Sequence, residues 1–225
     1  MYIIGNPYLK SYNYTKDYIF GILLLVLTLL NNTQLYSQNL SSENKKKLKT
    51  LAYYLSDQEI KYGKKFTPPG KKGSIKMDCS NTVKYTYKEA LGVLLPRTTY
   101  EQFQLVKSKG NFQTPPKTEE GKIDILLLKK NMKIGDLLFW INTHSDIPKT
   151  WNPPIGHVMI YLGTSKTKKM IMFGAGTYGD GFKTTTGGVD LYLFDPEMSL
   201  GCVKNKNKEC EVESEFFGYG KPPIE

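Results

Sequence analysis

Short apolar runs separated by loop-forming residues dominate the second half of the chain. Residues 137–141, 157–162, 169–173 and 189–194 are mostly apolar, rich in β-branched or aromatic side chains, and separated by segments that contain glycine. Runs of this length and composition are typical of β-strands. The pattern therefore predicts an antiparallel meander of strands in this half of the chain.

The first half of the chain shows helical spacing instead. Apolar residues recur at i, i+3, i+4 and i+7 at Leu48, Leu51, Ala52 and Leu55, which predicts a helix that runs to about Ser56. Helices that precede the strands, rather than alternate with them, favour an α+β fold over a βαβ fold.

A further helix is predicted over residues 78–91. Asp78 is a suitable N-cap, because its carboxylate can accept a hydrogen bond from the first turn, and Gly92 stands where a helix often ends. The apolar stripe of this helix consists of Cys79, Val83, Tyr87, Ala90 and Leu91. Cys79 therefore lies in the first turn, on the side that faces the core.

The N-terminal segment contains 12 uncharged, mostly apolar residues at positions 19–30. A membrane-spanning helix needs about 20 such residues, so this run is short for a span. With Lys10 and Lys16 before it and Ser37 after it, the segment is typical of a secretory signal peptide cut after Ser37. We therefore expect residues 1–37 to be removed and the protein to be exported to the periplasm or the extracellular space. An uncleaved N-terminal anchor is the alternative.

Behind this segment, we expect a helical lead-in over residues 38–60 and a single folded domain over residues 61–225. The chain of 225 residues is 40% hydrophobic and 23% charged, an ordinary globular composition that excludes a wholly disordered protein. It contains only three Cys and two His. This scarcity excludes a disulfide-dense scaffold and a zinc site built from many Cys and His ligands.

Export changes what the three cysteines imply, because thiols outside the cytoplasm tend to pair. Cys202 and Cys210 lie eight residues apart in a polar, Lys- and Asn-rich stretch, where they can close a small disulfide-bonded loop. Two unpaired surface thiols are the alternative. Cys79 is then left over, and an odd cysteine in an exported protein is a candidate reactive thiol. The alternative for Cys79 is a buried, inert side chain.

The charge of the chain is positive and comes almost entirely from lysine. Lys and Arg together number 31 against 21 Asp and Glu, for a net charge of +10, and Arg97 is the only arginine. Base readout in nucleic acids relies on arginine, whereas a lysine-rich surface suits diffuse attraction to polyanions. The charge therefore favours an anionic cell envelope over a nucleic acid as partner.

Cys79 is also the candidate nucleophile on local grounds. A thiol in the first turn of a helix faces free backbone N–H groups and the positive end of the helix dipole, both of which favour the thiolate. Such a nucleophile needs a general base. His144 lies in a polar, proline-containing loop, whereas His157 opens a predicted strand. Taken alone, His157 is better explained as a structural histidine at a strand end.

Four segments, taken together and in order, resemble the NlpC-type cell-wall peptidases, a papain-like family. They are DCS (residues 78–80), LPRTTYEQ (95–102), MKIGDLLFW (132–140) and GHVMIYLG (156–163). In the family, the first opens the nucleophile helix and the second follows it. The third resembles its Gly-Asp-Leu strand, and the fourth its His-Val-x-Ile-Tyr-x-Gly strand. The resemblance covers about residues 61–176.

The resemblance implies a papain-like α+β fold, in which N-terminal helices and a nucleophile helix pack on an antiparallel sheet or half-barrel. It implies Cys79 as nucleophile and His157 as base. It also implies a third polar group that orients the imidazole, usually a second histidine on the next strand. Residues 170–176 contain no histidine. We therefore expect a backbone carbonyl, a water molecule or a nearby polar residue such as Thr177 in this role.

The family also carries a tyrosine upstream of the nucleophile. Its hydroxyl can help to hold the oxyanion, with the backbone N–H of Cys79 as the other donor. Tyr62 is the candidate here, although it lies far from Cys79 in the sequence. The alternative is that Tyr62 is one more amphipathic tyrosine among the 16 in the chain.

The function that the resemblance implies is that of a secreted cysteine endopeptidase acting on peptidoglycan stem peptides. The bond cleaved is typically the γ-linkage between D-glutamate and a diamino acid. No metal or cofactor is required, and we expect a monomer. One alternative is an amidase or acyltransferase on the same scaffold. Another is a catalytically impaired protein that binds the envelope, which the missing second histidine supports.

Overall fold

The computed structural model describes residues 39–70, 75–177 and 181–224, which belong to one compact unit. The predicted signal peptide at residues 1–37 lies outside the described residues. Within the described ranges, no helix is long and apolar enough to cross a membrane. The helices are α2 (Ser42–Ser56), α3 (Cys79–Leu91), α4 (Thr99–Ser108) and α5 (Ile125–Asn131). The strands are β1 (Lys61–Tyr62), β2 (Lys76–Met77), β3 (Phe112–Gln113), β4 (Leu137–Ile141), β5 (Ile155–Thr164), β6 (Met170–Gly176), β7 (Gly188–Leu193), β8 (Cys202–Lys204), β9 (Cys210–Glu213) and β10 (Glu215–Gly220).

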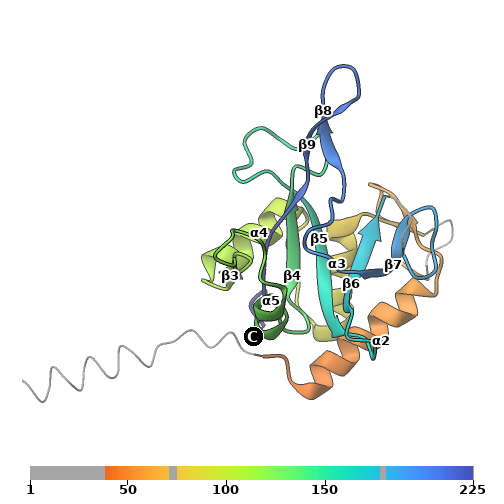
Figure 1. Cartoon of the computed structure of the whole chain (residues 1–225). Coiled ribbons are helices and arrows are strands. Elements are labelled where there is room, and N and C mark those ends of the chain that lie inside the picture. The colour runs from red at the N-terminus through yellow and green to blue at the C-terminus, as the bar shows by residue number, and fades with distance from the viewer. Residues whose placement is uncertain (1–38, 71–74, 178–180, 225) are drawn as a thin grey trace, which may run out of the picture. The chain divides into compact units, whose positions relative to one another are not determined.

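A six-stranded sheet in the order β3-β10-β4-β5-β6-β7 forms the centre of the unit, and every pair in it is antiparallel. Strands β4 to β7 follow one another as neighbours, as Figure 1 shows, so the predicted meander is confirmed. Strand β10 returns from the C-terminal part of the chain to pair with β4. The α+β class and the papain-like packing of helices on an antiparallel sheet are confirmed as well.

Both faces of the sheet are buried, because apolar side chains alternate between two cores along β4. Leu137 and Phe139 belong to the core that the helices cover, which also contains Cys79. Leu138 and Trp140 belong to the second core on the opposite face. Since successive side chains of a strand point to opposite faces, a continuous apolar run such as residues 137–141 fits a strand buried on both sides.

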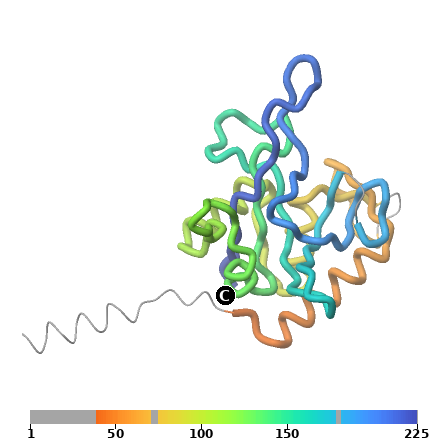
Figure 2. The backbone as a smooth tube through the Cα atoms, viewed as in Figure 1, coloured from red at the N-terminus to blue at the C-terminus, as the bar shows by residue number. Residues whose placement is uncertain are grey.

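Helix α2, which lies in the predicted lead-in, contributes to the main core. Its buried residues Leu48, Ala52 and Leu55 belong to the same apolar cluster as Cys79. The helix packs against α3 and β7 (Figure 2). The predicted helical spacing is confirmed, and the helix begins earlier than the apolar pattern, at the N-cap Ser41. That hydroxyl accepts a hydrogen bond from the backbone N–H of Asn44 at 3.1 Å.

Helix α3 begins and ends where the sequence predicts. The Asp78 carboxylate accepts a hydrogen bond from the backbone N–H of Asn81 at 2.8 Å, the interaction of an N-cap. Gly92 ends the helix with a positive φ of 72°. Its backbone N–H donates to the Lys88 carbonyl. Residues with a Cβ rarely adopt this backbone conformation, so the glycine explains why the helix stops there.

Helices α4 and α5 and strand β10 were not among the predicted elements. Helix α4 carries a complete capping box, in which Thr98 and Glu101 exchange hydrogen bonds at the first turn. This pattern is visible in the sequence as Thr-x-x-Glu and could have indicated the helix start. Strand β10 is harder to recognise in the sequence, because two of its six positions, Gly218 and Gly220, are glycines and interrupt the alternation of apolar and polar side chains.

Candidate active site

Cys79 is the first residue of α3 and lies beneath the surface. Its side chain is 5% exposed and belongs to the apolar core between the helices and the sheet. The sulfur lies against the backbone N–H groups of Ser80 and Val158. Val158 is on β5 and directly follows His157, so the start of α3 and the strand of the predicted base meet at this point.

The electrostatic surroundings of Cys79 favour the protonated thiol. Burial raises its pKa to about 12, and the negative charge of Asp78 acts in the same direction. The N–H groups of Val158 and Ser80 and the charge of Arg97 act in the opposite direction, with smaller effect. At neutral pH, Cys79 therefore rests as a thiol, and a base must remove its proton before the sulfur can attack a carbonyl.

His157 lies on β5 at an irregularity in the pairing with β4. It pairs with Trp140, whereas Ile141 pairs with Ile155, so Gly156 is an extra residue on β5. The rings of His157 and Trp140 meet edge to face, with centroids 5.9 Å apart. Burial, followed by the charge of His144, lowers the pKa of His157 to about 4, so the imidazole is neutral at neutral pH.

The His157 ring has a buried Nε2 atom with no hydrogen-bond partner among the described residues. The predicted orienting residue, Thr177, lies one position beyond the end of β6 with an exposed side chain, and it does not supply this bond. The described part of the chain therefore holds His157 by packing against Trp140, without a hydrogen bond at Nε2.

Tyr62 lies near Cys79, the candidate nucleophile, despite its distance in the sequence. Strand β1 pairs in parallel with β2, and this register sets Tyr62 beside Met77, two residues before Cys79. Burial raises the pKa of the Tyr62 hydroxyl, and the charges of Cys79 and Asp78 raise it further. The short parallel pair of β1 and β2 thus brings Tyr62 close to Cys79 in space. The sequence pattern did not indicate this pair.

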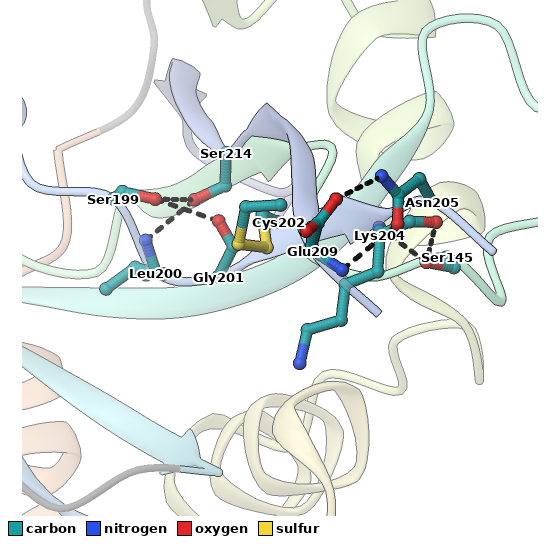
Figure 3. The surroundings of a disulfide bond; sticks show 10 residues. Ser145, Ser199, Leu200, Gly201, Cys202, Lys204, Asn205, Glu209 and Ser214 are labelled. Atoms are coloured by element: carbon teal, nitrogen blue, oxygen red, sulfur yellow. Dashed lines mark hydrogen bonds between the residues drawn. A yellow bond between two sulfur atoms is a disulfide. The ribbon is translucent and has the colours of Figure 1, made fainter. Parts of the chain in front are cut away.

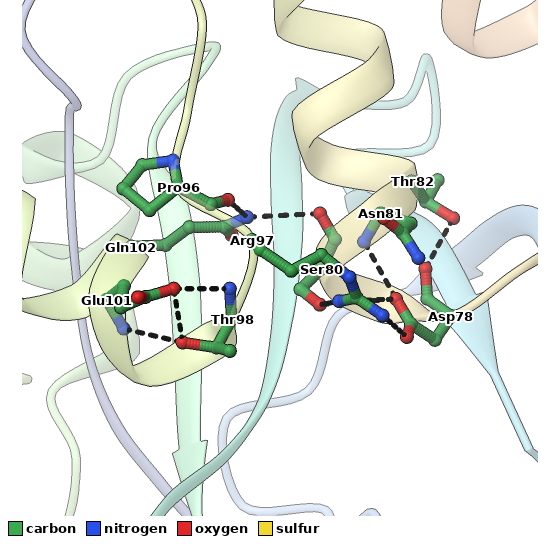
Figure 4. Close-up of polar contacts among 9 residues, drawn as sticks. All are labelled: Asp78, Ser80, Asn81, Thr82, Pro96, Arg97, Thr98, Glu101 and Gln102. Atoms are coloured by element: carbon green, nitrogen blue, oxygen red, sulfur yellow. Dashed lines mark hydrogen bonds and ion pairs between the residues drawn. The ribbon is translucent and has the colours of Figure 1, made fainter. Parts of the chain in front are cut away.

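Three residues that the sequence analysis did not assign to the site fasten the α4 segment to α3 and β5. The Arg97 guanidinium binds the side chains of Asp78 and Ser80 (Figure 4). Gln102 donates through Nε2 to the carbonyls of Ser80 and Pro96, at 3.0 Å each. The three are completed by the Thr99 hydroxyl, which donates to the carbonyl of Ile155 at 3.0 Å. All three residues belong to LPRTTYEQ, one of the four segments on which the resemblance rests. That segment could therefore have indicated them as residues of the site.

The second histidine, His144, lies in the exposed loop between β4 and β5. A hydrogen bond to the backbone of Gly156 brings it next to His157. The loop packs against Gly156 through Thr143 and Ile147, which leave no room for a Cβ atom there. His144 is therefore a neighbour of the predicted base, although it does not bind the buried Nε2 atom.

Cys202 and Cys210 form a disulfide, with Cα atoms 5.6 Å apart, so the predicted pair is confirmed. Cys79 is the free cysteine. The disulfide lies in the β8–β9 hairpin, which binds the β4–β5 loop, as Figure 3 shows. The Ser145 hydroxyl accepts from the backbone N–H of Lys204 at 2.8 Å and donates to its carbonyl at 3.3 Å.

Asp136 belongs to a different part of the sheet. Its carboxylate accepts a hydrogen bond from the backbone N–H of Lys133 at 2.7 Å and so caps the turn before β4. Burial raises the pKa of Asp136 to about 6. In the described ranges, no group of three or more His, Cys, Asp and Glu side chains could hold a metal ion.

A thiol that begins a helix packed on an antiparallel sheet, beside a strand that carries a histidine, is the arrangement of papain-like cysteine hydrolases. The sequence matches the NlpC/P60 family over residues 63–176, about half of the chain. The chain therefore belongs to the NlpC/P60 family, whose members are generally cysteine peptidases or related hydrolases of peptidoglycan. No curated protein matches the sequence.

Proposed function

We propose that this protein is an exported cysteine endopeptidase that hydrolyses amide bonds in peptidoglycan stem peptides. The bond would be the γ-linkage between D-glutamate and a diamino acid. The observation that carries the proposal is the contact of the Cys79 sulfur with the backbone N–H of Val158, since it sets the free thiol against the strand that carries His157. The family match supports the substrate class.

The reaction begins from a neutral thiol and a neutral imidazole. His157 accepts the Cys79 proton as the sulfur attacks the scissile carbonyl, and the backbone N–H of Cys79 and the Tyr62 hydroxyl donate to the developing oxyanion. The imidazolium then gives its proton to the departing amine, and a thioester remains on Cys79. Water, deprotonated by His157, hydrolyses the thioester, which releases the carboxylate and restores the thiol.

The general-base role fits the charges of the two groups. A His157 pKa of about 4 keeps the imidazole unprotonated and able to accept a proton at neutral pH. Because both partners rest uncharged, transfer of the Cys79 proton to His157 accompanies the attack of the sulfur on the carbonyl. The whole chain carries a net charge of +10, of which residues 1–37 contribute +1 through two lysines and one aspartate. The positive charge that remains after their removal suits a monomer that works at an anionic cell wall.

Digestion of purified muropeptides by the full chain tests the proposal. We expect wild type to release peptides cut after the γ-D-glutamyl residue, and Cys79→Ala and His157→Ala to lose at least roughly 10³-fold in rate. His144→Ala is the matched control, because it removes the other histidine and should retain most of the activity. Equal product release by wild type and Cys79→Ala would refute the proposal.

A catalytically impaired, envelope-binding protein is the second candidate. The observation that favours it is the buried Nε2 atom of His157, which has no partner among the described residues. A histidine whose tautomer is not set by a hydrogen bond is a weaker base catalyst. If wild type binds muropeptides but releases no product, this candidate replaces the first. An amidase or acyltransferase would instead leave an acyl group on Cys79 from a non-muropeptide substrate.

A further inference from the structure

Arg97 connects the two residues that flank Cys79 in the sequence. Its Nη2 atom lies 2.6 Å from Asp78 Oδ2, and its Nη1 atom lies 2.7 Å from Ser80 Oγ and 3.4 Å from Asp78 Oδ1 (Figure 4). One guanidinium therefore holds the side chains immediately before and after the nucleophile. A planar fork of N–H donors is suited to this bidentate contact, whereas a lysine ammonium is not.

Asp78 has two effects on the start of α3 that oppose each other. Its Oδ1 atom caps the helix by accepting from the N–H of Asn81 at 2.8 Å, and it accepts from the Ser80 hydroxyl at 3.2 Å. The same carboxylate places a negative charge beside the Cys79 sulfur, which disfavours the thiolate. The N-cap that orders the nucleophile helix thus works against the nucleophile.

Among the groups that act on the Cys79 sulfur, Arg97 is the one with a positive charge. Tyr62 faces Cys79 from β1. From β5 the backbone N–H of Val158 meets the sulfur, and the preceding residue, His157, is neutral. Asp78 and Arg97 are the charged groups that act on the thiol, and they act in opposite directions.

Stability alone does not account for this contact. The Arg97 side chain is 45% exposed, and exposed ion pairs contribute little to folding. The segment that carries Arg97 is already fastened by Gln102, whose Nε2 atom bonds the Ser80 and Pro96 carbonyls. The fork is directed at Asp78, which is 11% exposed, and this carboxylate is the one that acts on the sulfur.

We propose that Arg97 is a positioning residue of the active site, whose guanidinium holds Asp78 and Ser80 in place and offsets the Asp78 charge beside the Cys79 sulfur. This inference rests on the proposed function, in which Cys79 must become a thiolate. It assigns to the arginine of LPRTTYEQ a role in activating the nucleophile of DCS, 18 residues earlier in the chain.

The test is the rate at which iodoacetamide alkylates Cys79, measured against pH in the oxidised full chain. Cys79 is the single free thiol, because the other two cysteines are paired. We expect Arg97→Gln to slow alkylation at neutral pH by roughly tenfold, the factor for one unit of pKa, and Asp78→Asn to accelerate it by a similar factor. Asparagine is also a good N-cap, so Asp78→Asn keeps the start of the helix.

The double variant separates a charge effect from a loss of structure. If Arg97 acts through the Asp78 charge, Arg97→Gln combined with Asp78→Asn should alkylate within about threefold of wild type. Lys88→Gln is the matched control, since it removes one positive charge from the far end of α3 and should leave the pH profile unchanged. If both single variants slow alkylation, or neither changes its pH profile, the proposal is wrong.

Alkylation requires no substrate, so its outcome is independent of the peptidase assay. A protein that cleaves no muropeptide but shows the opposite shifts in Arg97→Gln and Asp78→Asn would retain this inference and lose the proposed function. A protein that cleaves muropeptides equally well with Arg97→Gln, with an unchanged alkylation profile, would retain the function and lose the inference.

Discussion

Met159 on β5 and Gly174 on β6 lie against each other, and a Cβ atom at position 174 would come within 2.9 Å of the Met159 Cγ atom. The two residues share the sheet face that carries Trp140 and the His157 ring. The other β6 positions on this face are methionines and Gly176, so β6 presents no polar side chain there. Met159 therefore occupies the space that a side chain at position 174 would need on this face.

This packing predicts that a side chain at position 174 is tolerated only if Met159 is shortened. Gly174→Ala should lower the free energy of unfolding by about 1–3 kcal/mol, because it overpacks a full core. In a Met159→Ala background the same substitution should cost much less, since the Cγ atom is gone. A double-mutant cycle by chemical denaturation measures the difference. The same cost in both backgrounds would contradict the packing argument.

The lowered pKa of His157 predicts a dependence of stability on pH. The unfolded imidazole binds a proton near its ordinary pKa of 6.5, whereas the folded one does so only near 4. Between these values the unfolded state binds more protons, so this histidine makes the protein less stable as the pH falls from 6.5 towards 4. Above pH 6.5 both states are neutral, and the contribution disappears.

Urea denaturation of wild type and His157→Gln over this pH range measures the effect. The stability of wild type relative to the variant should decrease steadily as the pH falls, because glutamine does not titrate. The raised pKa of Asp136, to about 6, changes the stability of both proteins alike and cancels in the comparison. A constant difference between the two proteins from pH 6.5 to 4 would show that His157 has no lowered pKa.

The position of Tyr62 predicts a role in the reaction rather than in folding. Tyr62→Phe removes the hydroxyl that we place at the oxyanion, so kcat on muropeptides should fall by roughly 10²-fold with little change in KM. Tyr85→Phe is a matched control on α3, where the ring packs against Phe66. If Tyr62→Phe and Tyr85→Phe had equal kcat, the Tyr62 hydroxyl would have no role in the reaction.

The Cys202–Cys210 disulfide should stabilise the protein mainly by restricting the unfolded chain. For a closed loop of this length, the loss of chain entropy corresponds to about 2.5 kcal/mol. We expect Cys202→Ser combined with Cys210→Ser to lower the unfolding free energy by about this amount. Reductant should lower the stability of wild type to the level of the variant and leave the variant unchanged. If reductant lowered the unfolding free energy of both proteins equally, the disulfide would not be the cause of its effect.

Much of the fold follows from local patterns in the sequence. The apolar runs from residue 137 onward predicted β4 to β7 because each strand is long and buried enough to show its composition. Asp78 and Gly92 marked the ends of α3 because N-caps and left-handed C-caps have strong residue preferences. Helix α5 has seven residues and β10 contains two glycines, so neither shows a clear period.

The sequence by itself determined helices α2 and α3, strands β4 to β7, the family and the chemical identity of the candidate nucleophile, because these depend on short-range spacing and residue type. Only the tertiary structure decided which side chains surround the sulfur. Tyr62 reaches Cys79 through a two-residue parallel pair, and Arg97 reaches Asp78 through the turn between α3 and α4. Gly174 lies against Met159 through the β5–β6 register. Such contacts join residues far apart in the chain, and their geometry depends on how whole elements pack rather than on the residues near each position.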